Sequence, residues 1–317
     1  GETVNIVYAD ATQGWIPLDD DVVADAPVAP PTQKAIFGYG STGSYVSMSN
    51  LVSSSGVVAT DVTGVGTARA NLAGTSYGVD KGIFAYGYTG SNVSMSNLAN
   101  NAGVIATDVT GVGTARYNLE ATTYGFDKAI FGYGWTSGYV SLSNLVSSSG
   151  VVASDTTGVG TVRASLAATT YGSSGQAIFG YGDSGAAASM TNLVTNVGVV
   201  GSDVSGVGTA RWDLAAATYG SDKAIFAYGK PSGYVSTSNL VSNTGVVSAD
   251  VTGVGTARGA LAAAGYGGDK AIFGYGGSGG YSSMTNLVNN SGVVASDVSG
   301  VGTNRQALAA AGYSTSA

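Results

Sequence analysis

The chain repeats one stretch of seven residues, which first occurs as Lys34-Ala35-Ile36-Phe37-Gly38-Tyr39-Gly40. Close copies of this stretch begin at Lys81, Lys128, Gln176, Lys223 and Lys270. The starting positions lie 47, 47, 48, 47 and 47 residues apart, so six copies of one unit fill residues 34–317. A repeat of this period predicts an architecture in which one supersecondary unit is built six times.

Each unit predicts four short β-strands. In the first unit these are the apolar segment 35–39 and the segments 45–52, 57–62 and 69–77, separated by turns rich in Gly and Ser. Small residues fill the fourth segment of later units, as in Leu214-Ala215-Ala216-Ala217, so this strand fits where blades converge on an axis. Four strands per unit, repeated six times, are typical of a β-propeller. A parallel β-helix is the alternative, but its rungs are usually shorter.

The two ends of the repeat region predict how the propeller closes. The first unit starts at Lys34 with no small-residue strand before it, whereas the last such strand, 305–313, has no unit after it. If the C-terminal strand completes the first blade, no sheet edge is left open. We therefore expect an all-β fold, a six-bladed β-propeller of four-stranded blades closed by the C-terminal strand.

Residues 1–33 precede the repeats and form a separate arm. Segments 3–8 and 15–18, on either side of a turn, predict a β-hairpin, and the acidic and then proline-rich segment 19–33 predicts an extended linker. The arm holds six acidic residues and no Lys or Arg, so it carries −6 of the formal net charge of −7. Because Gly1 falls within a pattern, we expect the chain to be a piece of a longer protein.

The composition excludes several classes of function. The chain contains no Cys and no His. Zinc sites built on these residues, cysteine nucleophiles and catalytic triads with a histidine base are therefore excluded. The near-neutral repeat region argues against nucleic-acid binding, which needs a basic surface. The apolar runs are too short to insert into a membrane, and no cofactor or metal site is predicted.

The unit resembles the kelch repeat of β-propeller proteins. The shared features are a repeated arginine (Arg69), a small-residue strand (Leu72-Ala73), an aliphatic strand that ends in glycines (36–40), a variable loop, and two strands around a turn. The unit differs in having Gly-Tyr-Gly in place of adjacent glycines, and Val152 and its equivalents where kelch units usually have Trp. The resemblance covers residues 34–317 and implies a propeller.

A second resemblance concerns the setting of the protein. The repeat, poor in charge and rich in Gly, Ser, Thr and Asn, is similar to repeats in virion proteins of bacteriophages, especially marine ones. The run Val7-Tyr8-Ala9-Asp10-Ala11-Thr12-Gln13-Gly14-Trp15 resembles the closing segment of phage fibre modules. These resemblances imply an adhesin of a phage tail or fibre, located outside the cell on the virion surface.

The six copies differ sharply at two places. One is the five-residue loop after each Gly-Tyr-Gly (Ala-Tyr-Gly in the second and fifth units), which begins at Ser41, Tyr88, Trp135, Asp183, Lys230 and Gly277. The other is the pair after the repeated arginine: Ala70-Asn71, Tyr117-Asn118, Ala164-Ser165, Trp212-Asp213, Gly259-Ala260 and Gln306-Ala307. Antiparallel strand order brings both places to the same end of a blade. We therefore expect them to form one variable face.

The variable face is the candidate binding site. Two of the three Trp residues fall there, and rigid aromatic side chains beside small polar ones are typical of recognition surfaces. Drift in exposed loops is the alternative, but drift should favour small polar residues over Trp. The candidate ligand-binding residues are Tyr45, Tyr88, Asn92, Tyr117, Asn118, Trp135, Tyr139, Asp183, Trp212, Asp213, Lys230, Tyr234, Tyr281 and Gln306.

These patterns favour a non-catalytic binding module that recognises a glycan or protein of the host surface. Its N-terminal arm would join it to the rest of a longer virion or fibre protein. Two other functions stay open: a structural decoration or spacer, and a hydrolase of surface polysaccharide. A hydrolase needs a catalytic group that breaks the repeat, and only Glu120, Asp183 and Asp213 do so among the acids, each in a different predicted blade.

The repeated arginine has two interpretations. It can form an anion site, or it can pair with the aspartate that stands eight residues earlier in every unit, as Asp61 stands before Arg69. Because buried charges are usually paired, we expect one Arg–Asp pair per blade, within or between blades. Glu120 replaces an alanine found in the other five units. We expect it to be a solvated acid, with a cation site as the alternative.

Overall fold

The computed structural model describes residues 6–10, 14–17 and 32–317. The first two ranges form a two-stranded antiparallel sheet of β1 (Ile6–Asp10) and β2 (Gly14–Pro17). The predicted pair of strands is present, although the strands begin and end at other residues than predicted. Residues 19–31 of the predicted linker lie outside the described residues. In the described ranges every regular element is a strand, and no helix there could cross a membrane.

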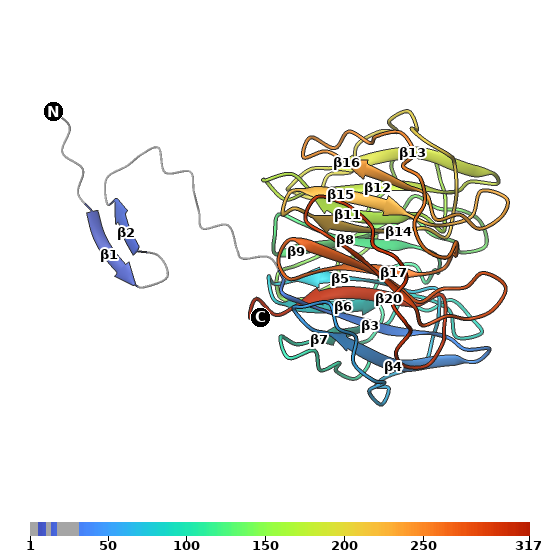
Figure 1. Cartoon of the computed structure of the whole chain (residues 1–317), viewed down its shortest axis with the longest axis horizontal. Helices are drawn as coiled ribbons and strands as arrows, with labels where there is room; N and C mark the ends of the chain where they lie inside the picture. Colours follow the sequence, from blue (N-terminus) through green and yellow to red (C-terminus); the bar gives the residue numbers. More distant parts are fainter. Residues whose placement is uncertain (1–5, 11–13, 18–31) are drawn as a thin grey trace.

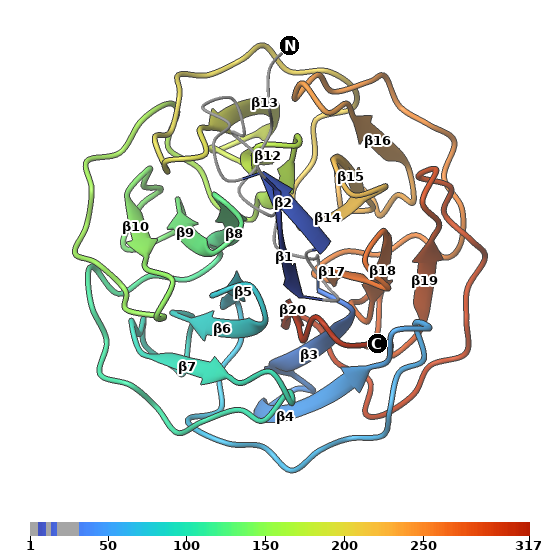
Figure 2. The same cartoon turned by 90° about the vertical axis from the view of Figure 1, so that its left-hand side faces the viewer.

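Residues 32–317 fold into six three-stranded antiparallel sheets that repeat one pattern. The sheets are arranged around an axis in a propeller-like fold, seen along the axis in Figure 2 and from the side in Figure 1. The inner strands are β5 (Ala73–Tyr77), β8 (Glu120–Tyr124), β11 (Ala167–Tyr171), β14 (Ala215–Tyr219), β17 (Ala262–Tyr266) and β20 (Ala309–Tyr313). The middle strands are β3 (Lys34–Ser41), β6 (Lys81–Ala85), β9 (Lys128–Gly132), β12 (Gln176–Asp183), β15 (Lys223–Ala227) and β18 (Lys270–Gly274). The third strands are β4 (Tyr45–Val52), β7 (Ser96–Ala99), β10 (Ser143–Val146), β13 (Ala187–Val194), β16 (Ser238–Val241) and β19 (Thr285–Val288).

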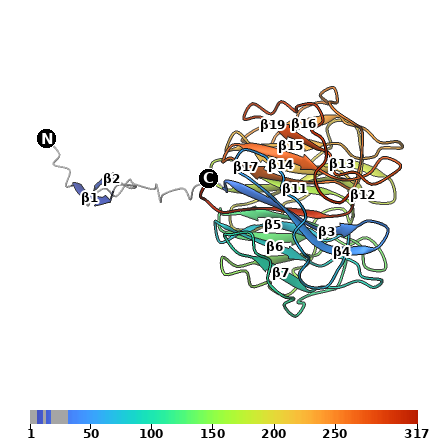
Figure 3. The ribbon, with the colours of Figure 1, turned by 60° about the horizontal axis from the view of Figure 1, so that its bottom comes forward.

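The first sheet combines the two ends of the repeat region. β20 pairs with β3, so that Ala309 lies opposite Gly38 and Tyr313 opposite Lys34. Beyond these strands the backbone N–H of Gln33 donates to the carbonyl oxygen of Ser314 at 2.7 Å. Figure 3 shows the C-terminus beside the start of the repeat region. The last strand of the chain therefore belongs to the sheet that β3 and β4 begin.

The predicted outermost strand of each unit is not a regular strand, so the expectation of four-stranded blades is wrong. In the first unit the segment 57–62 meets β4 only through isolated bridges, one of them between Val52 and Val58. Between the bridges the side-chain Nδ2 of Asn50 donates to the carbonyl oxygen of Ala59 at 3.0 Å. An amide side chain thus takes the place of the ladder hydrogen bonds.

The apolar core lies between neighbouring sheets, as the continuous apolar run of the middle strand predicts. Ile36 and Phe37 are both fully buried. Phe37 packs against the sheet of β17, with its ring centroid 5.1 Å from that of Tyr275, whereas Ile36 packs in a cluster with Phe84 of β6. A side chain buried on each face contributes about 2 kcal/mol of stability, so the middle strands join the sheets to one another.

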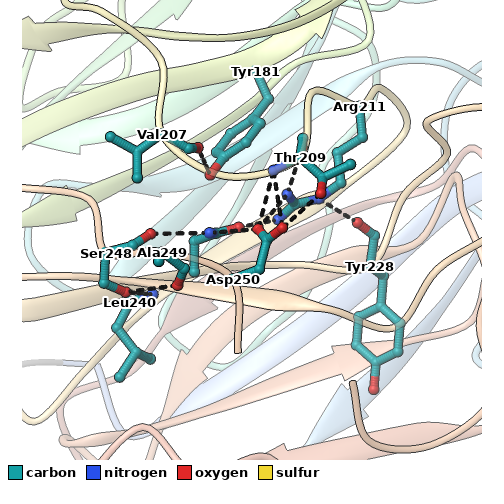
Figure 4. Close-up of polar contacts among 10 residues, drawn as sticks. Tyr181, Val207, Thr209, Arg211, Tyr228, Leu240, Ser248, Ala249 and Asp250 are labelled. Carbon is teal, nitrogen blue, oxygen red and sulfur yellow. Dashed lines mark hydrogen bonds and ion pairs between the residues drawn. The ribbon is translucent and has the colours of Figure 1, made fainter. Parts of the chain in front are cut away.

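A buried arginine fixes each segment that crosses from one sheet to the next (Figure 4). Arg211 stands just before β14; its Nε donates to the carbonyl oxygen of Tyr228 at 2.8 Å, and its Nη2 to Oδ1 of Asn239 at 2.7 Å. Its guanidinium carbon lies 4.4 Å from the ring centroid of Tyr181 in the preceding sheet. Because the side chain is fully buried, no anion from solvent can reach it. The interpretation of the arginine as an anion site is therefore wrong.

An aspartate completes this network. Asp250 Oδ1 lies 4.0 Å from Nη1 of Arg211, so the expected Arg–Asp pair is present. The partner is the aspartate of the following unit, and the same offset pairs Arg305 with Asp61. Asp250 accepts hydrogen bonds from the Thr209 hydroxyl at 2.6 Å and from Asn239 Nδ2 at 2.9 Å. Burial acts to raise the pKa of Asp250, but these hydrogen bonds and the arginine charge outweigh it and lower the pKa.

Candidate binding face

The two variable places of each unit meet as a cross-strand pair. In each sheet, the first residue of the variable loop lies opposite the residue that follows the repeated arginine. That arginine stands just before the inner strand of the sheet. In the fifth sheet, Lys230 and Trp212 exchange two backbone hydrogen bonds, of 2.8 and 3.2 Å. The six pairs are Ser41 with Gln306, Tyr88 with Ala70, Trp135 with Tyr117, Asp183 with Ala164, Lys230 with Trp212, and Gly277 with Gly259. Both variable sets therefore lie at the same end of the strands, as predicted.

The conserved backbone conformation of the Tyr-Gly pair before each variable loop sets the direction in which the loop leaves the middle strand. Tyr39 has a φ of 64° and Gly40 a φ of 111°. A Cβ at Gly40 would lie 2.8 Å from the carbonyl oxygen of Gln306, so only glycine fits there. The Tyr39 hydroxyl donates to the carbonyl oxygen of Val65 at 3.2 Å, which ties the buried ring to the crossing segment. The loop is thus held from below by parts that every unit shares.

Aromatic side chains form an arc across three neighbouring sheets of the variable face. We call Tyr45, Tyr88, Tyr117, Trp135 and Tyr139 the aromatic arc. The ring centroid of Tyr88 lies 6.1 Å from that of Tyr45 and 5.2 Å from that of Tyr117. The ring centroids of Trp135 and Tyr139 lie 4.5 Å apart. Tyr117 and Trp135 are joined as a cross-strand pair. The hydroxyl of Tyr139 then donates to Oδ2 of Asp183 in the next sheet at 2.6 Å, so the arc is continuous.

Charged residues of the face gather next to one end of the arc. Asp183 also accepts the backbone N–H of Gly185 at 2.9 Å. The hydrogen bond to Asp183, with burial, raises the pKa of the Tyr139 hydroxyl. The ammonium of Lys230 lies 5.3 Å from the ring centroid of Tyr234. In the part of the chain that the structure describes, Lys230 forms no ion pair, in contrast to Lys223 at the other end of β15, which pairs with Asp222 at 3.1 Å.

The remaining predicted residues lie apart from the arc or join it indirectly. Asn92 donates to the carbonyl oxygen of Thr136 at 3.1 Å, and so links the second loop to the third. Tyr281 is 40% exposed in the sixth loop. Gln306, paired with Ser41, belongs to the first sheet, whereas Asp183 belongs to the fourth and Lys230 to the fifth. The structure therefore links candidates of the first to the fourth sheets through direct side-chain contacts.

A closed ring of backbone hydrogen bonds surrounds the axis, and sequence reasoning missed it. Its members are Asn71, Asn118, Ser165, Asp213, Ala260 and Ala307, whose φ angles lie between 51° and 55°. Each N–H donates to the carbonyl oxygen of the preceding member at 2.8 or 2.9 Å, and Asn71 donates to Ala307. The signal in the sequence was the choice of Asn or Asp at three of the six positions, because these residues accept the left-handed conformation more readily than most. Asn118 and Asp213 thus serve the backbone at the axis, besides any contact with a ligand.

Acidic side chains lie on the axis below this ring. Asp213 and Glu120 line one small cavity of about 50 Å³ together with the leucines that directly precede the inner strands. Burial raises the pKa of Asp213, although Ser165 and Lys230 oppose the shift. Burial also raises the pKa of Glu120 from 4.5 to about 8, against a hydrogen bond from the N–H of Ala121. Glu120 is half-buried, with alanine and leucine side chains around it, so the expectation of a solvated acid is met only in part.

In the described residues no group of three or more His, Cys, Asp or Glu side chains could hold a metal ion. Comparison with known proteins adds no family: no protein-family model matches the sequence, and no curated protein matches it. The interpretation of the face therefore depends on its own geometry.

Proposed function

We propose that the chain is a six-bladed β-propeller, closed by β20, that acts as a non-catalytic binding module. In this proposal the six sheets are the blades, and the variable face recognises a glycan or protein on a host surface. The setting is the outside of a virion, in an adhesin of a phage tail or fibre. The N-terminal arm joins the module to the rest of that longer protein.

One observation carries the proposal: the six cross-strand pairs at the loop tips are all different, although the scaffold below them repeats. A spacer has no use for Trp135 and Tyr117 opposite each other in one sheet and Lys230 and Trp212 in another. Aromatic side chains offer a large contact area with few torsions to restrain, so they bind at low entropic cost. The support comes from where the units differ and from what they place there.

The aromatic arc favours an extended ligand. Its five side chains run along neighbouring loops and end at Asp183. Flat apolar rings in a row suit successive sugar rings of an oligosaccharide, whose C–H faces are apolar and whose hydroxyl groups find Asp183 and Asn92 within the same surface. We therefore favour a glycan over a protein as the ligand.

Binding of the purified chain to a glycan array and to intact host cells tests this function. The informative variants are Trp135→Ala and Tyr88→Ala in the arc, with Val57→Thr as control because Val57 is 65% exposed on the outer rim. Removing a central aromatic contact of about 2 kcal/mol should weaken binding about 30-fold. Val57→Thr should bind like the unchanged chain. Binding that survives both arc substitutions, or absence of binding to every glycan and cell type, would contradict the proposal.

A further inference from the structure

A cavity of about 260 Å³ opens on the axis at the end opposite the variable face. The inner strands build its wall, with Ala121, Ala168 and Ala263 among the lining residues. Val79 and Phe126 stand at its mouth, in turns that precede middle strands, whereas the variable loops follow the middle strands. Its size approaches that of pockets that enclose small molecules.

Hydroxyl groups line the wall of this cavity in a regular series. The hydroxyl of Thr123 donates to the carbonyl oxygen of Ser76 at 2.9 Å, that of Thr170 to Thr123 at 3.0 Å, and that of Thr218 to Thr170 at 2.8 Å. Ser76 likewise donates to the carbonyl oxygen of Gly312 at 2.9 Å. In four sheets, therefore, a hydroxyl group satisfies the carbonyl of the preceding inner strand.

The series is interrupted at Gly265, which stands where the next hydroxyl group would bind the carbonyl oxygen of Thr218. A Cβ at Gly265 would find its nearest neighbours at 3.7 and 3.9 Å, so the space beside it is open. Gly312 also lacks a hydroxyl group, but the side chain of Thr32 fills the corresponding space there. The cavity therefore presents one carbonyl oxygen, that of Thr218, in a space that the protein leaves open.

Two apolar residues at the mouth of the cavity, Val79 and Phe126, adopt a strained backbone conformation. Val79 has a φ of 74° and Phe126 a φ of 70°, whereas the same turn position holds Ser221 and Gly268 in other units. Glycine adopts this left-handed conformation without strain, and a β-branched valine rarely does. The two units thus place large apolar side chains where glycine fits better, and these side chains extend the apolar wall outward.

We propose that this cavity is a second binding site, independent of the variable face, for a small, uncharged and mainly apolar molecule that carries a hydroxyl or N–H donor. The alanines and the threonine methyl groups enclose the apolar body of the ligand, with Val79 and Phe126 at the mouth. Its donor binds the carbonyl oxygen of Thr218 in the space beside Gly265. Lys270, the cation of the lining, is already paired with Asp269 at 3.0 Å, so a ligand charge is not required.

Two naphthalene probes test the site on the full chain. We expect 1-naphthol to bind with one site per chain in isothermal titration calorimetry. The methyl ether 1-methoxynaphthalene has the same apolar body and no donor, so it should bind about five- to tenfold more weakly, the usual effect of one neutral hydrogen bond. Failure of 1-naphthol to bind, or equal affinity for the two probes, would overturn the proposal.

Gly265→Thr provides the decisive variant, because the chain itself uses threonine at the equivalent positions 123, 170 and 218. The new side chain fills the open space and donates to Thr218, so the protein should stay folded and lose its affinity for 1-naphthol at least tenfold. Gly265→Ser supplies the same hydroxyl group with less bulk, and should also weaken binding. Val57→Thr on the rim is the matched control and should leave binding unchanged. A folded Gly265→Thr protein that still binds 1-naphthol with full affinity refutes the site.

Discussion

Replacing Glu120 by alanine should stabilise the protein, and the gain should grow as the pH rises. Alanine is the residue of the other five units at this position, so the change restores the repeat. Glu120 faces a small axial cavity lined by alanines and leucines, and its hydrogen bond is to its own neighbour, the N–H of Ala121, at 3.3 Å. An ionised carboxylate in such surroundings is costly because little solvates it.

The pKa of Glu120 gives the magnitude and the pH range. In the unfolded chain the carboxyl has an ordinary pKa of 4.5, whereas burial raises the pKa to about 8 in the folded protein. Below pH 4.5 the group is protonated in both states and costs nothing. Between the two pKa values only the unfolded state ionises, so the free energy of unfolding falls as the pH rises, and above pH 8 the loss is complete. A pKa difference of one between the two states corresponds to about 1.4 kcal/mol. Water within the cavity reduces the total loss in the free energy of unfolding to on the order of 3 kcal/mol.

Urea unfolding followed by tryptophan fluorescence, repeated from pH 4.5 to 9, measures this loss. The absence of histidine leaves few other groups to titrate in the range. The original chain should lose stability steadily, Glu120→Ala should keep only the part of the loss that ionisation of Asp213 causes, and Glu120→Gln should have the same pH dependence but be less stable than Glu120→Ala. Asp213→Asn serves as the control for the other buried acid on the axis. Equal dependence on pH in the original chain and in Glu120→Ala would show that the Glu120 carboxylate is well solvated and that the reasoning is wrong.

Two further perturbations test the contacts between sheets. Asp155 accepts hydrogen bonds from the Thr114 hydroxyl at 2.6 Å and from Asn144 at 2.9 Å, so Asp155→Ala should lower the free energy of unfolding by about 1–3 kcal/mol in urea, whereas Val57→Thr should not. Burial acts to raise the pKa of Asp155, but these hydrogen bonds and the charge of Arg116 outweigh it and lower the pKa. The stability that they give is therefore present above the ordinary pKa of an aspartate and is lost as the pH falls through the lowered pKa. Circular dichroism should show acid unfolding below pH 4, and Asp155→Ala should move this unfolding to a higher pH. Deleting residues 303–317 removes β20 and exposes the edge of β3, so the product should be insoluble or should melt without cooperativity. A soluble truncated protein with one sharp thermal transition would contradict a ring closed by this strand.

Periodicity made the repeated all-β architecture predictable, because alternation and turn residues are local properties of the sequence. The meeting of Trp212 with Lys230 was also predictable, since antiparallel order alone brings the ends of those segments together. Spacing could not say whether Arg211 pairs with Asp203 of its own unit or with Asp250 of the next unit, because every unit carries an equivalent aspartate and sequence distance does not show which one lies nearby in space. The structure selects Asp250, which lies in the sheet that the arginine enters.

Features that depend on side chains replacing backbone contacts escaped prediction. The segment 57–62 has the apolar alternation of a strand, but Asn50 satisfies the carbonyl of Ala59 and leaves only isolated bridges. The partial burial of Glu120 was missed for a different reason. How wide an axial channel is, and therefore how much water solvates a carboxylate there, depends on how closely six sheets converge, which no single unit encodes.

The backbone ring at the axis has a consequence for how such a protein can change. Its hydrogen bonds join main-chain atoms, so any unit whose residue accepts a left-handed φ can occupy any of the six places. Units can therefore be exchanged or reordered by recombination between their near-identical sequences without disturbing the axis. Each rearrangement would bring different loop tips side by side and so compose a new surface from existing parts. The number of units is harder to change, because a ring of five or seven units would alter the angle between every N–H donor and its carbonyl acceptor in the ring.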